Sequence, residues 1–137
     1  MKLLLGTLLL LLSLNANAQY AITRVIDGDT VAFEAKFLPP PLKPELSLRI
    51  YGVDTPEKGA RAKCQQENER GQAATLFIHN VLRNAKSYRI VIMEWDKYGG
   101  RVLGDIIVDG MSLRSMLITN GLAREYYGDA KLSWCTR

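Results

Sequence analysis

Histidine is almost absent, since the 137-residue sequence contains only His79. Metal sites that need two or three imidazoles, including histidine-rich zinc sites, are therefore excluded. A Ser-His-Asp triad would have to use His79, and no Gly-x-Ser-x-Gly nucleophile turn is present. The sequence also lacks the glycine-rich phosphate loop of nucleotide-triphosphate-binding proteins. Any catalytic chemistry has to come from other side chains.

Cysteine is scarce too, with Cys64 and Cys135 as the two examples. They lie too far apart for a Cys-x-x-Cys redox motif. In an exported chain an even number of cysteines favours a disulfide over a metal site. A bridge across this separation would stabilise the fold by roughly 4 kcal/mol in the chain-entropy model. The alternative is a pair of free thiols.

Long apolar runs are confined to the N-terminus. Lys2, the leucine-dominated run from Leu3 to Leu14 and the small residues around Ala18 fit a secretory signal peptide, residues 1–18. A membrane anchor is the competing interpretation, but the run is shorter than the roughly 20 residues that a spanning helix needs. We expect one domain, residues 19–137, that is periplasmic or extracellular and has no stable membrane association after cleavage.

Neither sign of charge dominates the chain. The formal net charge is +4, from 18 lysines and arginines against 14 acidic residues. A mild basic excess is compatible with a polyanionic partner such as nucleic acid, but it does not identify one.

The hydrophobic pattern predicts several short strands and two helices. Alternation of Leu46, Leu48 and Ile50 buries one face of a strand and presents Arg49 on the other. Residues 88–95 are apolar on both faces and predict a central strand. Further predicted strands lie at 20–26, 30–33, 102–108 and 123–127, and the predicted helices at 67–84 and 112–120. In the first helix one apolar stripe is predicted, formed by Ala73, Phe77 and Val81 with Ala74, Ile78 and Leu82. The pattern predicts an α+β fold, mainly β: a small twisted barrel with packed helices.

Acidic residues occur where predicted strands end. Asp29 and Asp54 follow different strands, and a barrel could bring them together as the oxygen ligands that calcium prefers. The ordinary alternative for the Asp27-Gly28-Asp29 segment is a simple turn. Glu57 lies three residues after Asp54 and could deprotonate or position a metal-activated water. Its alternative role is a helix-start or solvent-facing glutamate.

Two arginines complete this chemistry. Arg49 and Arg101 each adjoin a loop next to a predicted strand, and a planar guanidinium suits the oxygens of a phosphate in transfer. Either arginine alone could simply be solvated. Together with the carboxylates they indicate a metal-dependent phosphodiesterase.

These segments resemble the thermonuclease family. The resemblance is carried by four segments, in this order along the chain: 25–30, 48–57, 96–101 and 121–127. It runs from about Tyr20 to Tyr127 and implies a five-stranded oligonucleotide-binding (OB-fold) barrel with two to three helices. It also implies calcium-dependent hydrolysis of DNA and/or RNA. We expect the protein to be a monomer.

The resemblance assigns roles to individual residues. Asp29 and Asp54 would bind Ca²⁺ with their carboxylates, and Thr55 with its backbone carbonyl. Glu57 would be the general base, while Arg49 and Arg101 would bind the phosphate and stabilise the transition state. The nucleotide would be contacted by Lys97, Tyr98 and Tyr127, with Tyr126 competing for the role of Tyr127.

The sequence departs from the family pattern in four places. An additional glycine precedes Arg101, a proline-rich segment (residues 39–44) lengthens one connection, and we expect no long C-terminal helix after the last predicted strand. The fourth departure is the cysteine pair, whose bridge we expect to fix the C-terminus in place of that helix. Two other functions stay open: a non-catalytic nucleic-acid-binding OB-fold protein, and a structural protein with a partner at the proline loop.

Overall fold

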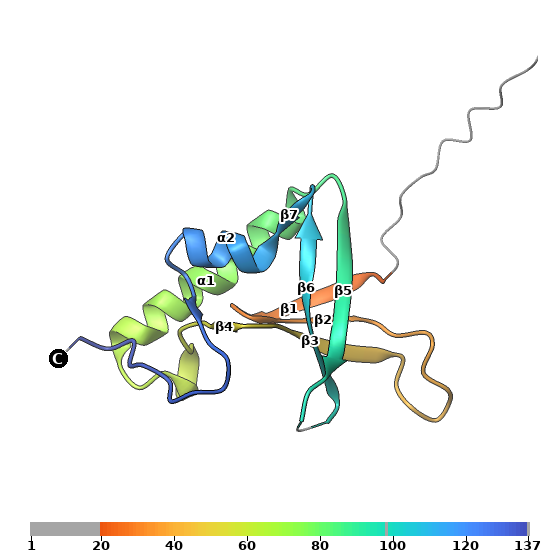
Figure 1. Ribbon diagram of the computed structural model, residues 1–137, viewed down its shortest axis with the longest axis horizontal. Helices are drawn as coiled ribbons and strands as arrows, with labels where there is room; N and C mark the ends of the chain where they lie inside the picture. Colours follow the sequence, from red (N-terminus) through yellow and green to blue (C-terminus); the bar gives the residue numbers. More distant parts are fainter. Residues whose placement is uncertain (1–19, 98, 137) are drawn as a thin grey trace, which may run out of the picture.

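The computed structural model describes residues 20–97 and 99–136 (Figure 1). The predicted signal peptide and Tyr98 lie outside the described residues. The strands are β1 (Ile22–Asp27), β2 (Thr30–Glu34), β3 (Glu45–Ile50), β4 (Val53–Asp54), β5 (Tyr88–Trp95), β6 (Arg101–Val108), β7 (Met111–Ser112) and β8 (Arg124–Glu125). The helices are α1 (Gln65–Arg83) and α2 (Leu113–Thr119), with a 3-10 turn at Gly59–Arg61. The α+β, mainly β prediction is confirmed.

The main sheet follows the order β1-β2-β3-β6-β5. All neighbours on this path are antiparallel except β3 and β6, which are parallel. Figure 1 shows the β5–β6 hairpin crossing the β1–β3 layer. Within the described residues no backbone pairing joins β1 to β5, so the five-stranded path is open. A hydrogen bond links its two ends: the Ile22 N–H donates to the Tyr88 hydroxyl at 2.9 Å.

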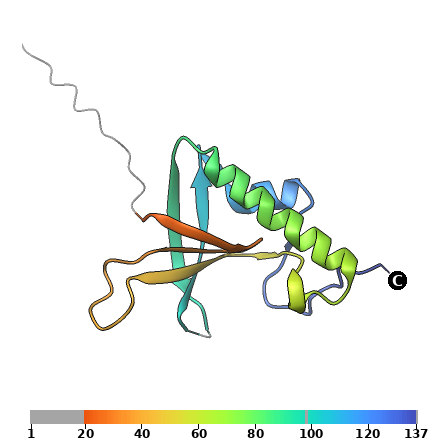
Figure 2. The same cartoon turned by 180° about the vertical axis from the view of Figure 1, so that it is seen from behind.

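The core lies between the sheet and the two helices. Helix α1 packs on β1 and helix α2 on β6, and Figure 2 shows both helices on the same side of the sheet. Strand side chains such as Phe33, Leu48 and Ile106 are fully buried, as are Ile78 of α1 and Leu117 of α2. The predicted burial of Leu46, Leu48 and Ile50 is confirmed. No helix among the described residues is long and apolar enough to cross a membrane.

Two details of the predicted pattern are wrong. Strand β5 lies at the end of the strand order, and Met93 and Trp95 are 56% and 58% exposed. A register shift between Ile92 and Glu94 disrupts the alternation of buried and exposed positions, so these apolar side chains are exposed. Ala73, expected in the apolar stripe of α1, is exposed, because the helix turns its Ala74–Ile78 face to the core.

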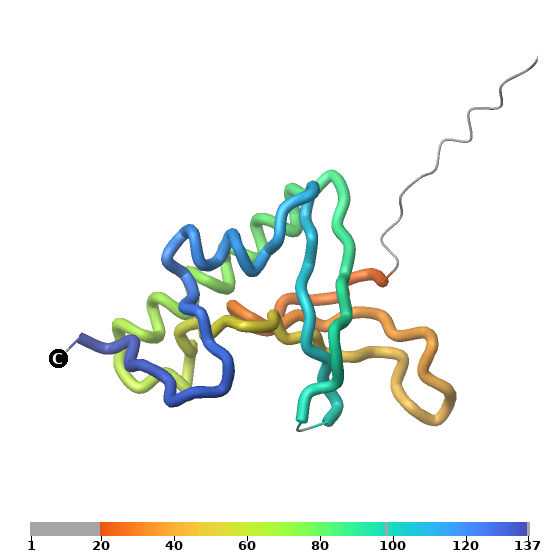
Figure 3. Tube along the Cα trace, viewed as in Figure 1, coloured from red at the N-terminus to blue at the C-terminus, as the bar shows by residue number. Residues whose placement is uncertain are grey.

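The C-terminal segment returns to the start of α1. Figure 3 shows it running beside the first turns of that helix. The predicted disulfide is confirmed, since Cys64 and Cys135 are bonded with their Cα atoms 6.2 Å apart. Thr136 adds hydrogen bonds from its N–H and its hydroxyl to Oε1 of Gln66.

Candidate functional site

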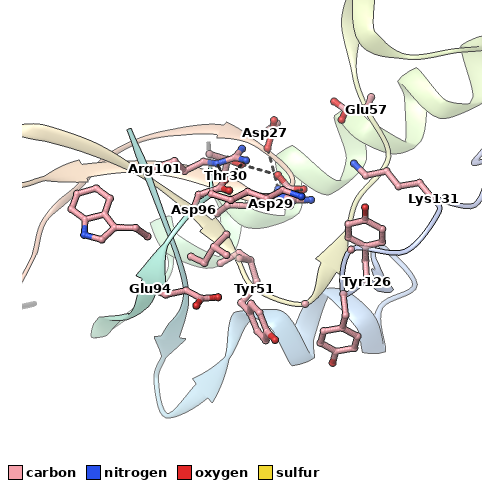
Figure 4. Close-up of a pocket in the computed structure, with 18 of the residues that line it drawn as sticks. Asp27, Asp29, Thr30, Tyr51, Glu57, Glu94, Asp96, Arg101, Tyr126 and Lys131 are labelled. Atoms are coloured by element: carbon pink, nitrogen blue, oxygen red, sulfur yellow. Dashed lines mark hydrogen bonds and ion pairs between the residues drawn. The ribbon is translucent and has the colours of Figure 1, made fainter. Parts of the chain in front are cut away.

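A cleft of about 610 Å³ opens where the ends of β1, β3, β5 and β6 meet the C-terminal segment (Figure 4). Its lining is dominated by charged and aromatic side chains. The sequence-predicted site residues that line it are Asp29, Arg49, Glu57, Lys97, Arg101 and Tyr127. Tyr126 lines it as well, so the choice between the two tyrosines stays open.

Asp29 and Arg49 meet across neighbouring strands. Arg49 on β3 is the register partner of Thr30 on β2, and Asp29 lies just before Thr30. Nε of Arg49 is 3.6 Å from Oδ2 of Asp29, and the guanidinium also donates to the Val53 carbonyl at 3.4 Å. The Asp29 side chain is 13% exposed and accepts a 2.8 Å hydrogen bond from the Thr30 hydroxyl. The predicted turn therefore places a nearly buried carboxylate beside a guanidinium.

This carboxyl group ionises less readily than that of an ordinary aspartate. Burial raises the pKa of Asp29 to about 6, and the neighbouring Asp27 carboxylate adds to the rise. The Arg49 guanidinium and the Thr30 hydroxyl lower the pKa, but by less. The site therefore holds more negative charge than its surroundings stabilise, which is the condition that a bound cation relieves.

Glu57 lies in the segment that precedes helix α1, and contacts with that helix fix its position. Its N–H donates to Oε1 of the buried Glu67 at 3.3 Å. A Cβ on Gly71 would lie 2.4 Å from the Glu57 carbonyl oxygen, so only glycine allows α1 to approach this segment so closely. The Glu57 carboxylate lies 3.5 Å from Nε of Arg61, whose guanidinium also contacts Asp27 at 3.2 Å. Sequence reasoning missed Arg61, although its position four residues after Glu57 was a usable signal.

Arg101 enters the cleft from the start of β6. Gly99 and Gly100 both have positive φ values, 72° and 68°, so the additional glycine takes part in the turn that precedes Arg101. Nε of Arg101 donates to Oδ2 of the buried Asp96 at 2.6 Å. Because β3 and β6 are adjacent and parallel, Arg49 and Arg101 reach the same cleft.

Asp54, which is predicted to be a cation ligand, contacts side chains of the C-terminal segment. It is 5% exposed, and neither Asp54 nor the buried Thr55 lines the cleft. The Asp54 carboxylate is contacted on both oxygens, by Nζ of Lys131 at 3.3 Å from Oδ1 and by Nε1 of Trp134 at 3.1 Å from Oδ2. Sequence reasoning missed Lys131 and Trp134, because nothing local links them to a residue about 80 positions earlier.

The donor atoms fit a hard divalent cation. Asp29, Asp54 and the carbonyl of Thr55 offer only oxygen, the ligand type such ions prefer. One of these carboxylates, Asp54, already forms an ion pair with the Lys131 ammonium group. Among the described residues no three carboxylates have oxygens within 4.8 Å of one another; the one group that meets this distance, Cys64, Glu67 and Cys135, has its sulfurs joined in the disulfide.

The comparison with known families agrees with this arrangement. The family model for staphylococcal nuclease homologues matches residues 47–133. The chain belongs to the staphylococcal nuclease family. Members of this family are generally nucleases, typically act with divalent metal ions and take nucleic acid as substrate. No curated protein sequence matches the chain significantly.

Aromatic side chains line one end of the cleft in this staphylococcal nuclease homologue. The rings of Tyr51 and Tyr127 lie 5.8 Å apart, and the Tyr127 hydroxyl accepts a 2.5 Å hydrogen bond from Arg114. Nζ of Lys131 lies 5.4 Å from the centre of the Tyr126 ring. The phenol faces and the amino group form a surface on which a base and its phosphate could rest.

Proposed function

We propose that this chain is an exported, calcium-dependent nuclease that hydrolyses phosphodiester bonds of DNA and/or RNA. The observation that carries the proposal is the convergence of Arg49, Arg101, Asp29 and Glu57 on one cleft. Guanidinium groups beside carboxylates are the combination that phosphoryl transfer requires: charge stabilisation for the phosphate and a proton acceptor for water.

The cation site is proposed beside this cleft, with Asp29 in the cleft lining and Asp54 and Thr55 outside it. The carboxylates of Asp29 and Asp54 and the carbonyl of Thr55 would hold Ca²⁺, which supplies Lewis-acid stabilisation of the phosphate and lowers the pKa of bound water. Asp29 is nearly buried, and its pKa is raised because the protein stabilises its negative charge poorly. A cation bound there would supply the missing stabilisation.

The remaining chemistry belongs to the protein. Glu57 accepts the proton of the attacking water, and its position is fixed by Glu67 and by the close approach of Gly71. Arg49 and Arg101 bind the non-bridging oxygens of the phosphate. Their charges stabilise the pentacoordinate transition state more than the ground state, because negative charge grows on those oxygens.

Substrate contacts are proposed at both sides of the arginines. Lys97 follows the buried Asp96 and is exposed at the cleft, where it can pair with a neighbouring phosphate. Tyr127, or Tyr126 beside it, provides a face for stacking a base. Tyr98 is proposed for a nucleotide contact on the family resemblance alone, because it lies outside the described residues.

Export and a monomeric state complete the proposal. The predicted signal peptide, residues 1–18, lies outside the described residues, and the domain is proposed as residues 19–137. The Cys64–Cys135 bridge supports an oxidising compartment, where disulfides persist.

The decisive experiment compares cleavage with and without calcium. The mature protein is incubated with single-stranded DNA and with RNA, in Ca²⁺ or in chelator, beside Glu57→Gln and Arg101→Ala. We expect both variants to lose about a hundredfold or more in kcat, the usual effect of removing a catalytic base or charge. Glu69→Gln and Arg89→Ala are matched controls, since both side chains are exposed and lie outside the cleft.

Two results would contradict the proposal. Cleavage in chelator would exclude the calcium mechanism, and full activity in both variants would exclude the assigned residues. Nucleic-acid binding without cleavage under any divalent cation would favour the non-catalytic OB-fold function.

A further inference from the structure

The C-terminal segment supplies both side-chain partners of Asp54. Lys131 contacts Oδ1 at 3.3 Å and the Trp134 indole N–H donates to Oδ2 at 3.1 Å. Both partners come from a segment that the disulfide ties to the start of α1. A proposed cation ligand is thus oriented by side chains almost at the other end of the domain.

Trp134 is rigidly held where it meets Asp54. It is 7% exposed, and the Arg124 guanidinium lies 3.7 Å above its ring. Arg124 also donates to the carbonyls of Leu132 and Ser133, at 3.2 and 3.0 Å. The same arginine is the register partner of Asp54 in the β4–β8 pair. The indole and the carboxylate are therefore fixed to one another through the backbone as well as through their hydrogen bond.

Lys131 has a different position and a different charge. Its side chain is 47% exposed and lines the cleft, whereas the Asp54 carboxylate behind it does not. Figure 4 shows its amino group pointing toward the part of the cleft that holds Asp29 and Glu57. A cation arriving from the cleft would meet Lys131 before it met Oδ1 of Asp54.

The two partners must affect a divalent cation in opposite ways. The neutral indole N–H occupies Oδ2 and fixes the carboxylate orientation, as hydrogen bonds behind metal ligands do, without adding a competing positive charge. The ammonium group occupies Oδ1 with a full positive charge, so it repels a second cation and has to leave when one binds.

We propose that Trp134 is a positioning residue for Asp54 and that Lys131 is a resident counter-cation, which a divalent cation displaces into the cleft. The Cys64–Cys135 bridge keeps this arrangement in place. Once displaced, the Lys131 amino group lies beside Arg49 and the tyrosines that line the cleft and can pair with a phosphate of the nucleic acid. This inference rests on the proposed cation site at Asp54.

The test measures calcium binding directly, by isothermal titration calorimetry of the oxidised mature protein with CaCl₂ and no nucleic acid. Trp134→Phe keeps an aromatic ring under Arg124 but removes the N–H, and we expect Ca²⁺ affinity to fall about tenfold. Lys131→Met keeps the aliphatic chain but removes the charge, and we expect affinity to rise by about threefold or more. Trp95→Phe and Lys43→Met, both exposed and without a contact to Asp54, should leave affinity unchanged.

Two further measurements test the inference in other ways. The first keeps Trp134 but removes the disulfide, and the second tests whether Lys131 binds nucleic acid once Ca²⁺ has displaced it. The double variant Cys64→Ser/Cys135→Ser keeps the indole but frees the segment, and it should weaken Ca²⁺ binding in the same direction as Trp134→Phe. With Ca²⁺ present and Glu57→Gln blocking cleavage, Lys131→Met should bind a short single-stranded oligonucleotide several-fold more weakly.

The outcomes separate this inference from the proposed function. The inference would be overturned if Trp134→Phe and Lys131→Met bound Ca²⁺ with the same affinity, or if Lys131→Met bound it more weakly than the unaltered protein. Either result would leave the cation site itself intact. Absence of Ca²⁺ binding in the unaltered protein would overturn the cation site itself, and the inference with it.

Discussion

Nε of Arg49 lies 3.6 Å from Oδ2 of Asp29, so a proposed phosphate ligand and a proposed cation ligand form an ion pair. Both side chains are largely buried, at 20% and 13% exposure. A cation on Asp29 would weaken this pair and free the guanidinium for phosphate. Cation and substrate are therefore expected to strengthen one another's binding, as coupled sites must do reciprocally.

Replacing Asp29 should stabilise the metal-free protein at neutral pH. Its pKa is raised from the ordinary 3.8 to about 6, so between these values the folded state binds more protons than the unfolded state. Stability from this group is therefore present below about pH 4 and is lost as pH rises to about 6. In Asp29→Asn that loss is absent, and the gain at pH 7 should be up to about 3 kcal/mol.

Urea unfolding in chelator at pH 4 and pH 7 measures this difference. The variant should be more stable than the parent at pH 7 and about equally stable at pH 4, and it should lose Ca²⁺ binding. Asp129→Asn, an exposed acidic position, is the control and should show no such pH dependence. An Asp29→Asn variant less stable than the parent at pH 7 would contradict the argument.

Asp96→Asn should weaken substrate turnover without touching the cation site. The buried Asp96 accepts a 2.6 Å hydrogen bond from Nε of Arg101, and a charged acceptor holds a guanidinium more firmly than an amide does. We expect kcat/KM to fall about tenfold, since asparagine retains one acceptor oxygen. Ca²⁺ affinity measured without nucleic acid should stay unchanged; a parallel loss of calcium binding would show that the effect is general misfolding.

Gly71→Ala should disturb Glu57 through the backbone. The added methyl group would lie 2.4 Å from the Glu57 carbonyl oxygen and 2.8 Å from that of Pro56. Neither atom can move without shifting the segment, so we expect a loss of about 1–3 kcal/mol in the free energy of unfolding. The folded variant should also be less active than the parent, because the shifted segment carries Glu57. Gln72→Ala, on the exposed face of the same helix, should change neither quantity, and an unaffected Gly71→Ala enzyme would refute the proposed role of this contact.

The parts of the site that the sequence predicts are those encoded locally. Asp29 and Arg49 could be found because turn residues and period-two alternation fix which way each side chain points. Lys97 and Arg101 belong to one short turn. In each case, a few neighbouring residues decide the geometry.

The missed features depend on tertiary neighbours. Trp134 looks like an isolated aromatic in the sequence, and its meaning appears only when the disulfide brings it to Asp54. The edge position of β5 could not be predicted either, because apolar composition does not distinguish a central strand from an exposed one that carries a bulge. Asp54 was predicted as a cation ligand from its type and spacing, a role that stays a prediction, whereas its partners Lys131 and Trp134 were not predicted.

Breaking the Cys64–Cys135 bridge should lower the melting temperature by several degrees or more. The bridge spans 71 residues, and the chain-entropy model assigns such a loop roughly 4 kcal/mol. Scanning calorimetry with and without a dithiol reductant measures the effect. The double variant Cys64→Ser/Cys135→Ser should melt at the lower temperature whether or not the reductant is present. An unchanged melting point, or free thiols in the isolated protein, would contradict the bridge's stabilising role. Because Trp134 immediately precedes Cys135, the additional stabilisation by Ca²⁺ should also be smaller in the reduced protein.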